Sequence, residues 1–266
     1  MLGLDMQLYV CIVYERFVFV DSRLTIRRAV RDYWKREAKR AGWFLASGSL
    51  LGKLWEFLRD STPSRLRQRY GDADYDWDHR VNTTGAAVGW RDRLLGVLHS
   101  PYQPTEPGLF HEIIDELRRR TGADLSHFIF LDPGSGKGRT LLMAADYPFQ
   151  KIIGVELLPS LHEIARENLQ RYRSESRKCF ALESICADAT SFPLPENPLV
   201  IYLFNPFPEP GLRQLCANLG RSLRQHPRAV YVTYHNPVLE YVLLESSFLR
   251  KIAGTHQYSI FAATQV

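Results

Sequence analysis

Apolar residues follow two patterns along the second half of this chain. Seven short runs are rich in apolar residues, and those at 128–131 and 198–204 are apolar throughout, which is typical of strands buried on both faces of a sheet. Between these runs, apolar residues recur every three or four positions, as on the buried face of a helix. Strands that alternate with helices predict an α/β fold. The predicted strands cover residues 128–131, 152–155, 184–187, 198–204, 229–234, 248–252 and 258–262, and the predicted helices cover 106–120, 141–145, 159–172, 212–223 and 238–245.

The first hundred residues follow a different pattern. Residues 8–20 are rich in Val, Ile, Tyr and Phe, which predicts a strand or hairpin. Helical spacing then predicts a helix over residues 25–41 and a second one over about 50–58, whose stripe is Leu51, Leu54, Trp55 and Leu58. We therefore expect a mainly helical N-terminal extension over residues 1–100 and a larger domain over residues 101–266.

Residues 71–79 carry acids at alternating positions, which raises the possibility of a calcium loop. The EF-hand loop needs Gly where Trp77 stands and Glu where Thr83 stands. We interpret the segment as a polar loop or an edge strand and predict no metal site. The four cysteines are scattered without a C-x-x-C pair, so neither a disulfide framework nor a zinc site is expected, and a reducing cytoplasm fits the chain.

A glycine-rich turn follows the first predicted strand of the larger domain. Asp132 ends the apolar run, Gly134, Gly136 and Gly138 follow, and the next predicted strand ends at Glu156. This βαβ pattern is typical of nucleoside-binding sites, because glycines let the backbone approach a ligand closely. A phosphate-binding P-loop requires a Gly at position 131 and a Ser or Thr at 138, and a dinucleotide fingerprint requires a Gly at 139. The chain has Leu, Gly and Arg there, so both motifs fail.

The remaining pattern, D-x-G-x-G-x-G with a glutamate that ends the second strand, resembles the class I S-adenosylmethionine (SAM)-dependent methyltransferases. The run G-S-G-K-G-R also resembles uncharacterised bacterial members. The resemblance covers about residue 102 to the C-terminus, and it implies a Rossmann-like, mostly parallel sheet of seven strands with helices on both faces. It also implies that SAM is the cofactor.

The resemblance also implies a set of cofactor contacts. Glu156 is placed to accept hydrogen bonds from both ribose hydroxyls, and an acid in the position of Asp188 reads the adenine amino group. The lead-in Tyr-x-Pro-Thr resembles a segment that covers the methionine end of SAM in protein-lysine methyltransferases. The predicted cofactor-binding residues are Tyr102, Thr105, Asp132, Gly134, Ser135, Gly136, Gly138, Glu156, Leu157, Asp188, Ala189 and Asn205.

Asn205-Pro206-Phe207 follows the strand predicted over residues 198–204, at the edge where open α/β sheets place their sites. The Asn205 side chain and the Pro206 carbonyl could orient an amine, and Phe207 could pack on the acceptor. Family members that methylate amino groups often carry a second proline here, which this chain lacks. We expect a protein side-chain amine, resembling lysine, as acceptor; a small molecule, a nucleic-acid base, or non-catalytic SAM binding are the alternatives.

Charge adds one feature to this picture. The chain of 266 residues carries a net charge of +5, and residues 21–41 alone contain eight Lys or Arg against three acids, which equals that excess. Arg28, Arg31, Lys35 and Lys39 line one face of the predicted helix. Such a face is either solvated surface or a contact for an acidic partner or nucleic acid, and lying on a membrane is a further alternative. The apolar stretch 8–20 is interrupted by charges and predicts no membrane span.

Overall fold

The computed structural model describes residues 30–31, 34–35, 38–39, 42–60, 73–83 and 105–264. The chain forms two compact units. The described residues between 30 and 60 belong to one unit, and residues 73–83 belong to the other together with 105–264. A single boundary near residue 100, as expected from the sequence, therefore differs from the observed division.

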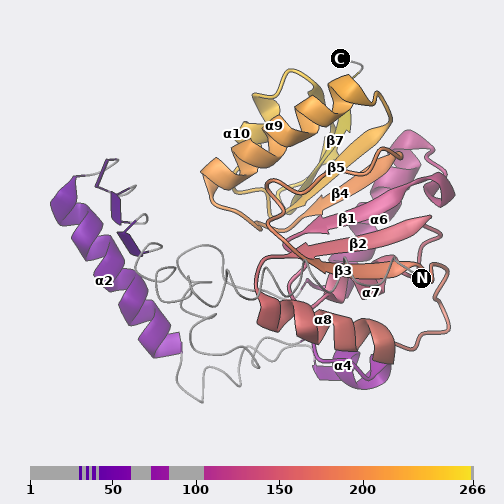
Figure 1. Ribbon diagram of the computed structural model, residues 1–266, viewed down its shortest axis with the longest axis horizontal. Helices are drawn as coiled ribbons and strands as arrows, with labels where there is room; N and C mark the ends of the chain where they lie inside the picture. Colours follow the sequence, from indigo (N-terminus) through magenta and orange to yellow (C-terminus); the bar gives the residue numbers. More distant parts are fainter. Residues whose placement is uncertain are drawn as a thin grey trace, which may run out of the picture. The chain divides into compact units, whose positions relative to one another are not determined.

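The larger unit is built on a seven-stranded sheet in the order β3-β2-β1-β4-β5-β7-β6 (Figure 1). The first five strands pair in parallel, and β7 runs antiparallel to both β5 and β6. This arrangement confirms the predicted α/β fold with its closing hairpin pair. The strands are β1 (Ile129–Pro133), β2 (Lys151–Glu156), β3 (Leu182–Cys186), β4 (Leu199–Leu203), β5 (Val230–His235), β6 (Leu249–Gly254) and β7 (Tyr258–Ala263).

Helices cover both faces of this sheet, as predicted (Figure 1). The first of them follows strong local signals: the Glu106 carboxylate accepts hydrogen bonds from the backbone N–H of Gly108 and Leu109, and Gly122 ends the helix in a left-handed conformation. The helices are α6 (Pro107–Thr121), α7 (Arg139–Ala144), α8 (Pro159–Arg171), α9 (Glu209–Gln225) and α10 (Glu240–Leu244), with a short 3-10 turn, η1 (Leu125–His127).

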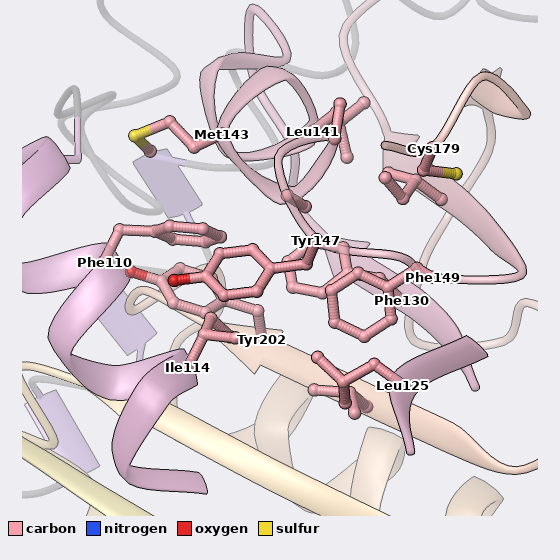
Figure 2. Close-up of a cluster of buried hydrophobic side chains, with 14 of the residues drawn as sticks. Phe110, Ile114, Leu125, Phe130, Leu141, Met143, Tyr147, Phe149, Cys179 and Tyr202 are labelled. Atoms are coloured by element: carbon pink, nitrogen blue, oxygen red, sulfur yellow. The ribbon is translucent and has the colours of Figure 1, made fainter. Parts of the chain in front are cut away.

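Two apolar cores lie on opposite faces of the sheet, because successive residues of a strand point to opposite sides. In β4, Val200 and Tyr202 belong to the core under α6 and α7, and Leu199, Ile201 and Leu203 belong to the core under α9 and α10. Figure 2 shows the first core, where aromatic side chains gather around Phe130 and Tyr202. Burial on both faces explains why the central strands are apolar at consecutive positions.

The segment interpreted as a polar loop or edge strand over 71–79 is a helix, α4 (Ala73–His79), so that interpretation was wrong. Tyr75 and His79 are four residues apart and their rings lie 4.5 Å from each other, which is helical spacing. His79 also lies 5.3 Å from the Tyr172 ring beyond the end of α8. Because acids occupy every second position of this segment, the helical spacing of Tyr75 and His79 is not apparent in the sequence.

The N-terminal unit contains helix α2 (Trp43–Asp60), which begins earlier than the helix predicted over 50–58. The Leu51 and Trp55 side chains are 66% and 67% exposed, so at these positions the predicted stripe is not buried. The described residues between 30 and 39 are helical, as predicted, with Arg31, Lys35 and Lys39 exposed. The strand or hairpin predicted over 8–20 lies outside the described residues.

The described residues contain neither a membrane-spanning helix nor a cluster of metal ligands. None of their helices is long and apolar enough to cross a membrane. In the same parts of the chain, no group of three His, Cys, Asp or Glu side chains is arranged to hold a metal ion.

Candidate functional site

Residues 134–139, which we call the cofactor loop, connect β1 to α7 at the carboxyl edge of the sheet. Gly134, Gly136 and Gly138 have φ values of 96°, 55° and 80°, a region that side chains rarely adopt. The backbone N–H of Gly134 donates to the Val155 carbonyl at 2.7 Å, which holds the loop against β2. The three glycines are therefore required by the backbone conformation of the loop.

Glu156 lies at the end of β2 and faces this loop. Its side chain is 6% exposed, and its two oxygens accept hydrogen bonds from the backbone N–H of Gly136 and of Leu158, each at 2.8 Å. A carboxylate oxygen can accept more than one hydrogen bond. Glu156 thus fixes the cofactor loop, and a carboxylate at this place has the chemistry to bind the hydroxyl groups of a ribose.

The Asp132 carboxyl lies beneath the cofactor loop. It is buried and accepts a hydrogen bond from the Thr140 hydroxyl. Burial raises its pKa to about 7; the hydrogen bond from Thr140 works against this, and the nearby charge of Glu156 adds to it. Burial therefore favours the neutral form of the Asp132 carboxyl more than solvent exposure would.

Asp188 and its neighbours follow β3 on the same edge. The Asp188 carboxylate accepts hydrogen bonds from the Thr190 backbone N–H at 2.9 Å and from the Thr190 hydroxyl at 2.7 Å. Ala189 is buried, whereas Leu157, after β2, is 57% exposed. The Ala187 N–H donates to the Glu156 carbonyl at 3.0 Å, so the ends of β2 and β3 are tied together.

Asn205 follows β4 with a left-handed φ of 45°, which is uncommon outside glycine. Its side-chain oxygen accepts a hydrogen bond from the Tyr234 hydroxyl at 2.8 Å, and its amide nitrogen donates to the Asn236 carbonyl at 2.9 Å. These two bonds fix the orientation of the amide. Within the described residues, no hydrogen bond to the Pro206 carbonyl is found.

The cofactor loop and the Asn205–Phe207 loop touch each other. A Cβ built on Gly134 would lie 2.6 Å from the Cβ of Pro206. Similarly, a Cβ on Gly211 would meet Phe207 at 2.9 Å and the Thr190 methyl group at 3.6 Å. These approaches place the loops that follow β1, β3 and β4 at one edge of the sheet.

Most predicted site residues are described, and they gather along this edge. Thr105, just before α6, is buried near the hydroxyl of Tyr202. Tyr202 in turn hydrogen-bonds to the His235 imidazole at 2.9 Å, and that ring stacks on Phe204 at 4.0 Å. Tyr102 lies outside the described residues, so its predicted contact stays a prediction.

A second layer of side chains lies behind the cofactor loop, and no local pattern in the sequence predicts it. Lys137 and Arg139 are basic residues, yet both are buried, at 0% and 2% exposure. They contact residues 73–83, and Asn168 of α8 joins the same group. The hydrogen bonds of Lys137 and Arg139 with residues 73–83 join positions 55 and 56 residues apart, so a local sequence pattern cannot predict them.

The residues present suit SAM. Glu156 offers a carboxylate for the ribose hydroxyls, and Asp188 and the backbone around Ala189 offer partners for adenine. The Ser135 hydroxyl in the cofactor loop is buried and has no hydrogen-bond partner among the described residues. The glycines leave room for a ligand to approach the backbone, as a nucleoside cofactor requires.

Residues 130–226 match the family model described as a methyltransferase domain. No curated protein shows a significant match to the chain.

Similar solved structures include an RNA methyltransferase from Salinibacter ruber in complex with S-adenosyl-L-homocysteine, at 18% identity and a TM-score of 0.39, covering 61% of this chain and 93% of that one. The rRNA methyltransferase AviRa from Streptomyces viridochromogenes has 14% identity and a TM-score of 0.43, covering 62% and 86%. The glycopeptide N-methyltransferase MtfA complexed with sinefungin has 16% identity and a TM-score of 0.44, covering 59% and 94%.

Proposed function

We propose that this chain, which carries a methyltransferase domain and uses SAM as its methyl donor, transfers the methyl group to an amine on a protein side chain. The observation that carries the proposal is the contact between Gly134 and Pro206. It brings the loop suited to the cofactor against a loop that presents oxygen acceptors. An amine bound at the second loop would lie beside the donor bound at the first.

SAM supplies a methyl group on a positively charged sulfur, which an uncharged nucleophile displaces in line. The chain must therefore hold the acceptor in line and keep it neutral, since orientation alone removes much of the barrier. Asn205 Oδ1 and the Pro206 carbonyl are the candidate partners for the N–H groups of the amine. Tyr234 and Asn236 hold the Asn205 amide, so its oxygen is fixed before the acceptor binds.

Phe207 is the third residue of the proposed acceptor site. It is half-buried, and it packs with the apolar core under α9. Its aromatic ring offers a surface for the alkyl chain of a lysine-like acceptor or for the developing cation. Because Gly211 brings Phe207 near Thr190, we propose that Phe207 also closes the site toward Asp188.

The cofactor contacts are proposed for the residues predicted from the sequence. Glu156 would accept hydrogen bonds from the ribose hydroxyls, Asp188 and Ala189 would contact adenine, and Leu157 would lie over the adenine ring. Thr105 would contact the methionine end. We expect SAM to bind with a Kd of about 1 μM, which corresponds to about 8 kcal/mol. A cytoplasmic location stays a prediction.

The experiment is a transfer assay with the purified full chain, methyl-labelled SAM and a cell lysate. We expect acid-precipitable label that protease releases and nuclease does not, with methylated lysine after hydrolysis. Label released by nuclease, or label that enters only the small-molecule fraction, would contradict the protein acceptor. SAM binding without transfer to any lysate fraction would show a non-catalytic SAM-binding protein.

Two asparagine variants connect the assay to the site. Asn205→Ala should lower the transfer rate about a hundredfold, because the acceptor would no longer be held in line. Asn218→Ala is the matched control, since the Asn218 amide also donates to a backbone carbonyl, that of Phe192, but lies on α9. Equal rates for the two variants would remove Asn205 from the proposed site.

A further inference from the structure

Residues 73–83, which we call the clamp segment, lie against the cofactor loop from outside the region that matches the methyltransferase family. The family match begins at residue 130, and the clamp segment comes from well before it in the chain. In Figure 1, α4 lies beside α8. His79 Nδ1 lies 3.1 Å from the Arg173 carbonyl beyond the end of α8, and this contact fixes α4 at that place.

Asn168 of α8 joins the clamp segment to the cofactor loop. It is 1% exposed, and its side-chain oxygen accepts a hydrogen bond from the Asn82 backbone N–H at 2.7 Å. Its amide nitrogen donates to the carbonyls of Asn82 and Lys137, both at 2.9 Å. The Lys137 ammonium in turn donates to the Asn82 side-chain oxygen at 3.2 Å. Lys137, between two left-handed glycines, is therefore held at its backbone and at its side chain.

Arg139 is held by a second set of contacts. Its guanidinium lies 4.3 Å above the Tyr75 ring and donates to the Thr83 hydroxyl at 3.2 Å. The Thr83 hydroxyl donates to the Asp76 carboxylate, and the Thr83 backbone N–H donates to the other oxygen of that carboxylate at 2.8 Å. Thr83 thus stands between the acid of α4 and the first residue of α7.

These contacts matter for binding because a glycine-rich loop is costly to order. Fixing the backbone of a residue costs conformational entropy, and glycine loses the most freedom. If the loop is already ordered, the free energy of cofactor binding is not reduced by this entropy cost. Gly136, whose N–H meets Glu156, is next to Lys137, so a change at Lys137 would move the backbone that faces the cofactor.

We propose that Asn82 and Thr83 are positioning residues of the cofactor site, which hold Lys137 and Arg139 so that the cofactor loop is ordered before SAM binds. The clamp segment is then a functional part of the SAM site. This inference rests on the proposed function in one respect, namely that the cofactor loop binds SAM.

The experiment measures SAM affinity by calorimetry in the full chain, well below the unfolding temperature of each variant. Thr83→Val removes the hydroxyl, and Thr83→Ser keeps it. Thr233→Val is the matched control, because Thr233 is also 0% exposed and its hydroxyl donates only to the Ile201 carbonyl at 3.3 Å in β4. We expect Thr83→Val to raise the Kd about tenfold, and Thr83→Ser and Thr233→Val to bind as the parent does.

Hydrogen exchange of residues 134–139 in the absence of SAM gives an independent readout. Exchange should become faster in Thr83→Val and not in Thr233→Val. Should Thr83→Val fail to fold, Asn82→Ala replaces it, since Asn82 is exposed and its side chain holds Lys137.

The proposal is overturned if the variant of the clamp segment binds SAM within about twofold of the parent and its loop exchanges at the same rate. A parent chain that does not bind SAM would refute the proposed function instead. In that case the exchange rates alone still decide whether the clamp segment orders the loop.

Discussion

Replacing Gly134 by alanine tests the contact on which the proposed site depends. The new Cβ would lie 2.6 Å from the Cβ of Pro206, whereas carbon atoms in contact are about 3.5–4.0 Å apart. One of the two loops must therefore move by about 1 Å. Displacement of a reacting group by about 1 Å typically costs about a hundredfold in rate.

The left-handed backbone of Gly134 contributes a separate cost. An alanine at a φ of 96° is strained by about 1–2 kcal/mol whatever surrounds it. Gly122→Ala measures this backbone strain alone, because Gly122 has a φ of 65° and its added Cβ would meet nothing within 4 Å. The overlap with Pro206 should add about 1–3 kcal/mol to the destabilisation by Gly134→Ala.

The assay compares the two alanine variants by thermal unfolding and by transfer of labelled methyl groups to lysate protein. Gly122→Ala should lose a few degrees in unfolding temperature and keep its transfer rate. Gly134→Ala should lose more stability and about a hundredfold in transfer rate. If both variants transfer at the parent rate, the contact between the cofactor loop and Pro206 does not position the acceptor, and our reasoning about the site is refuted.

Three further predictions concern the ribose contact, the buried lysine of the cofactor loop and the basic residues near the N-terminus. Glu156→Gln should weaken SAM binding at least tenfold in calorimetry, because an amide N–H₂ would face the backbone N–H of Gly136 or Leu158. The control is Glu163→Gln, at an exposed residue, and equal affinities of the two variants would show that Glu156 does not contact the ribose. Burial lowers the pKa of Lys137 from 10.5 to about 8, so the unfolded chain binds more protons between these pH values and the free energy of unfolding should rise with pH there. Denaturant unfolding at a series of pH values should show this rise in the parent and not in Lys137→Met. If the free energy of unfolding depends on pH in the same way in both proteins, the prediction is wrong. Changing the exposed residues Arg31, Lys35 and Lys39 to Glu should leave SAM affinity intact and lower kcat/KM for an acidic partner, and this loss should shrink as the salt concentration rises. If activity is unchanged at every salt concentration, these residues form only a solvated surface.

The central strands could be predicted from the sequence because burial on both faces leaves a direct local mark. Residues 198–204 are apolar in succession, and the observed β4 lies inside them. The glycine pattern and Glu156 also act over a short range, since the loop and the end of β2 belong to one βαβ unit. These local signals suffice for the fold and for the edge where the site lies.

The contacts behind the cofactor loop could not be predicted in this way. Lys137 and Asn82 are 55 residues apart, and nothing near either position indicates the other. The ring contact of Tyr75 with His79 on α4 is hidden in the sequence, because acids occupy every second position between and around them. Burial of a Lys and an Arg depends on partners supplied by tertiary structure, so local composition predicts exposure instead.

Titratable groups at the site edge favour a neutral surface beneath the reacting atoms. Burial lowers the pKa of His235 to about 4, so its imidazole is uncharged at pH 7, and burial raises the pKa of Asp132 to about 7. Burial also keeps the Tyr202 hydroxyl protonated. A cationic His235 beside the Asn205 loop would repel both a sulfonium and a protonated amine. Around His235 and Tyr202 the edge therefore offers hydrogen-bond partners without a positive charge, which suits the proposed acceptor amine because that amine must be neutral when it attacks.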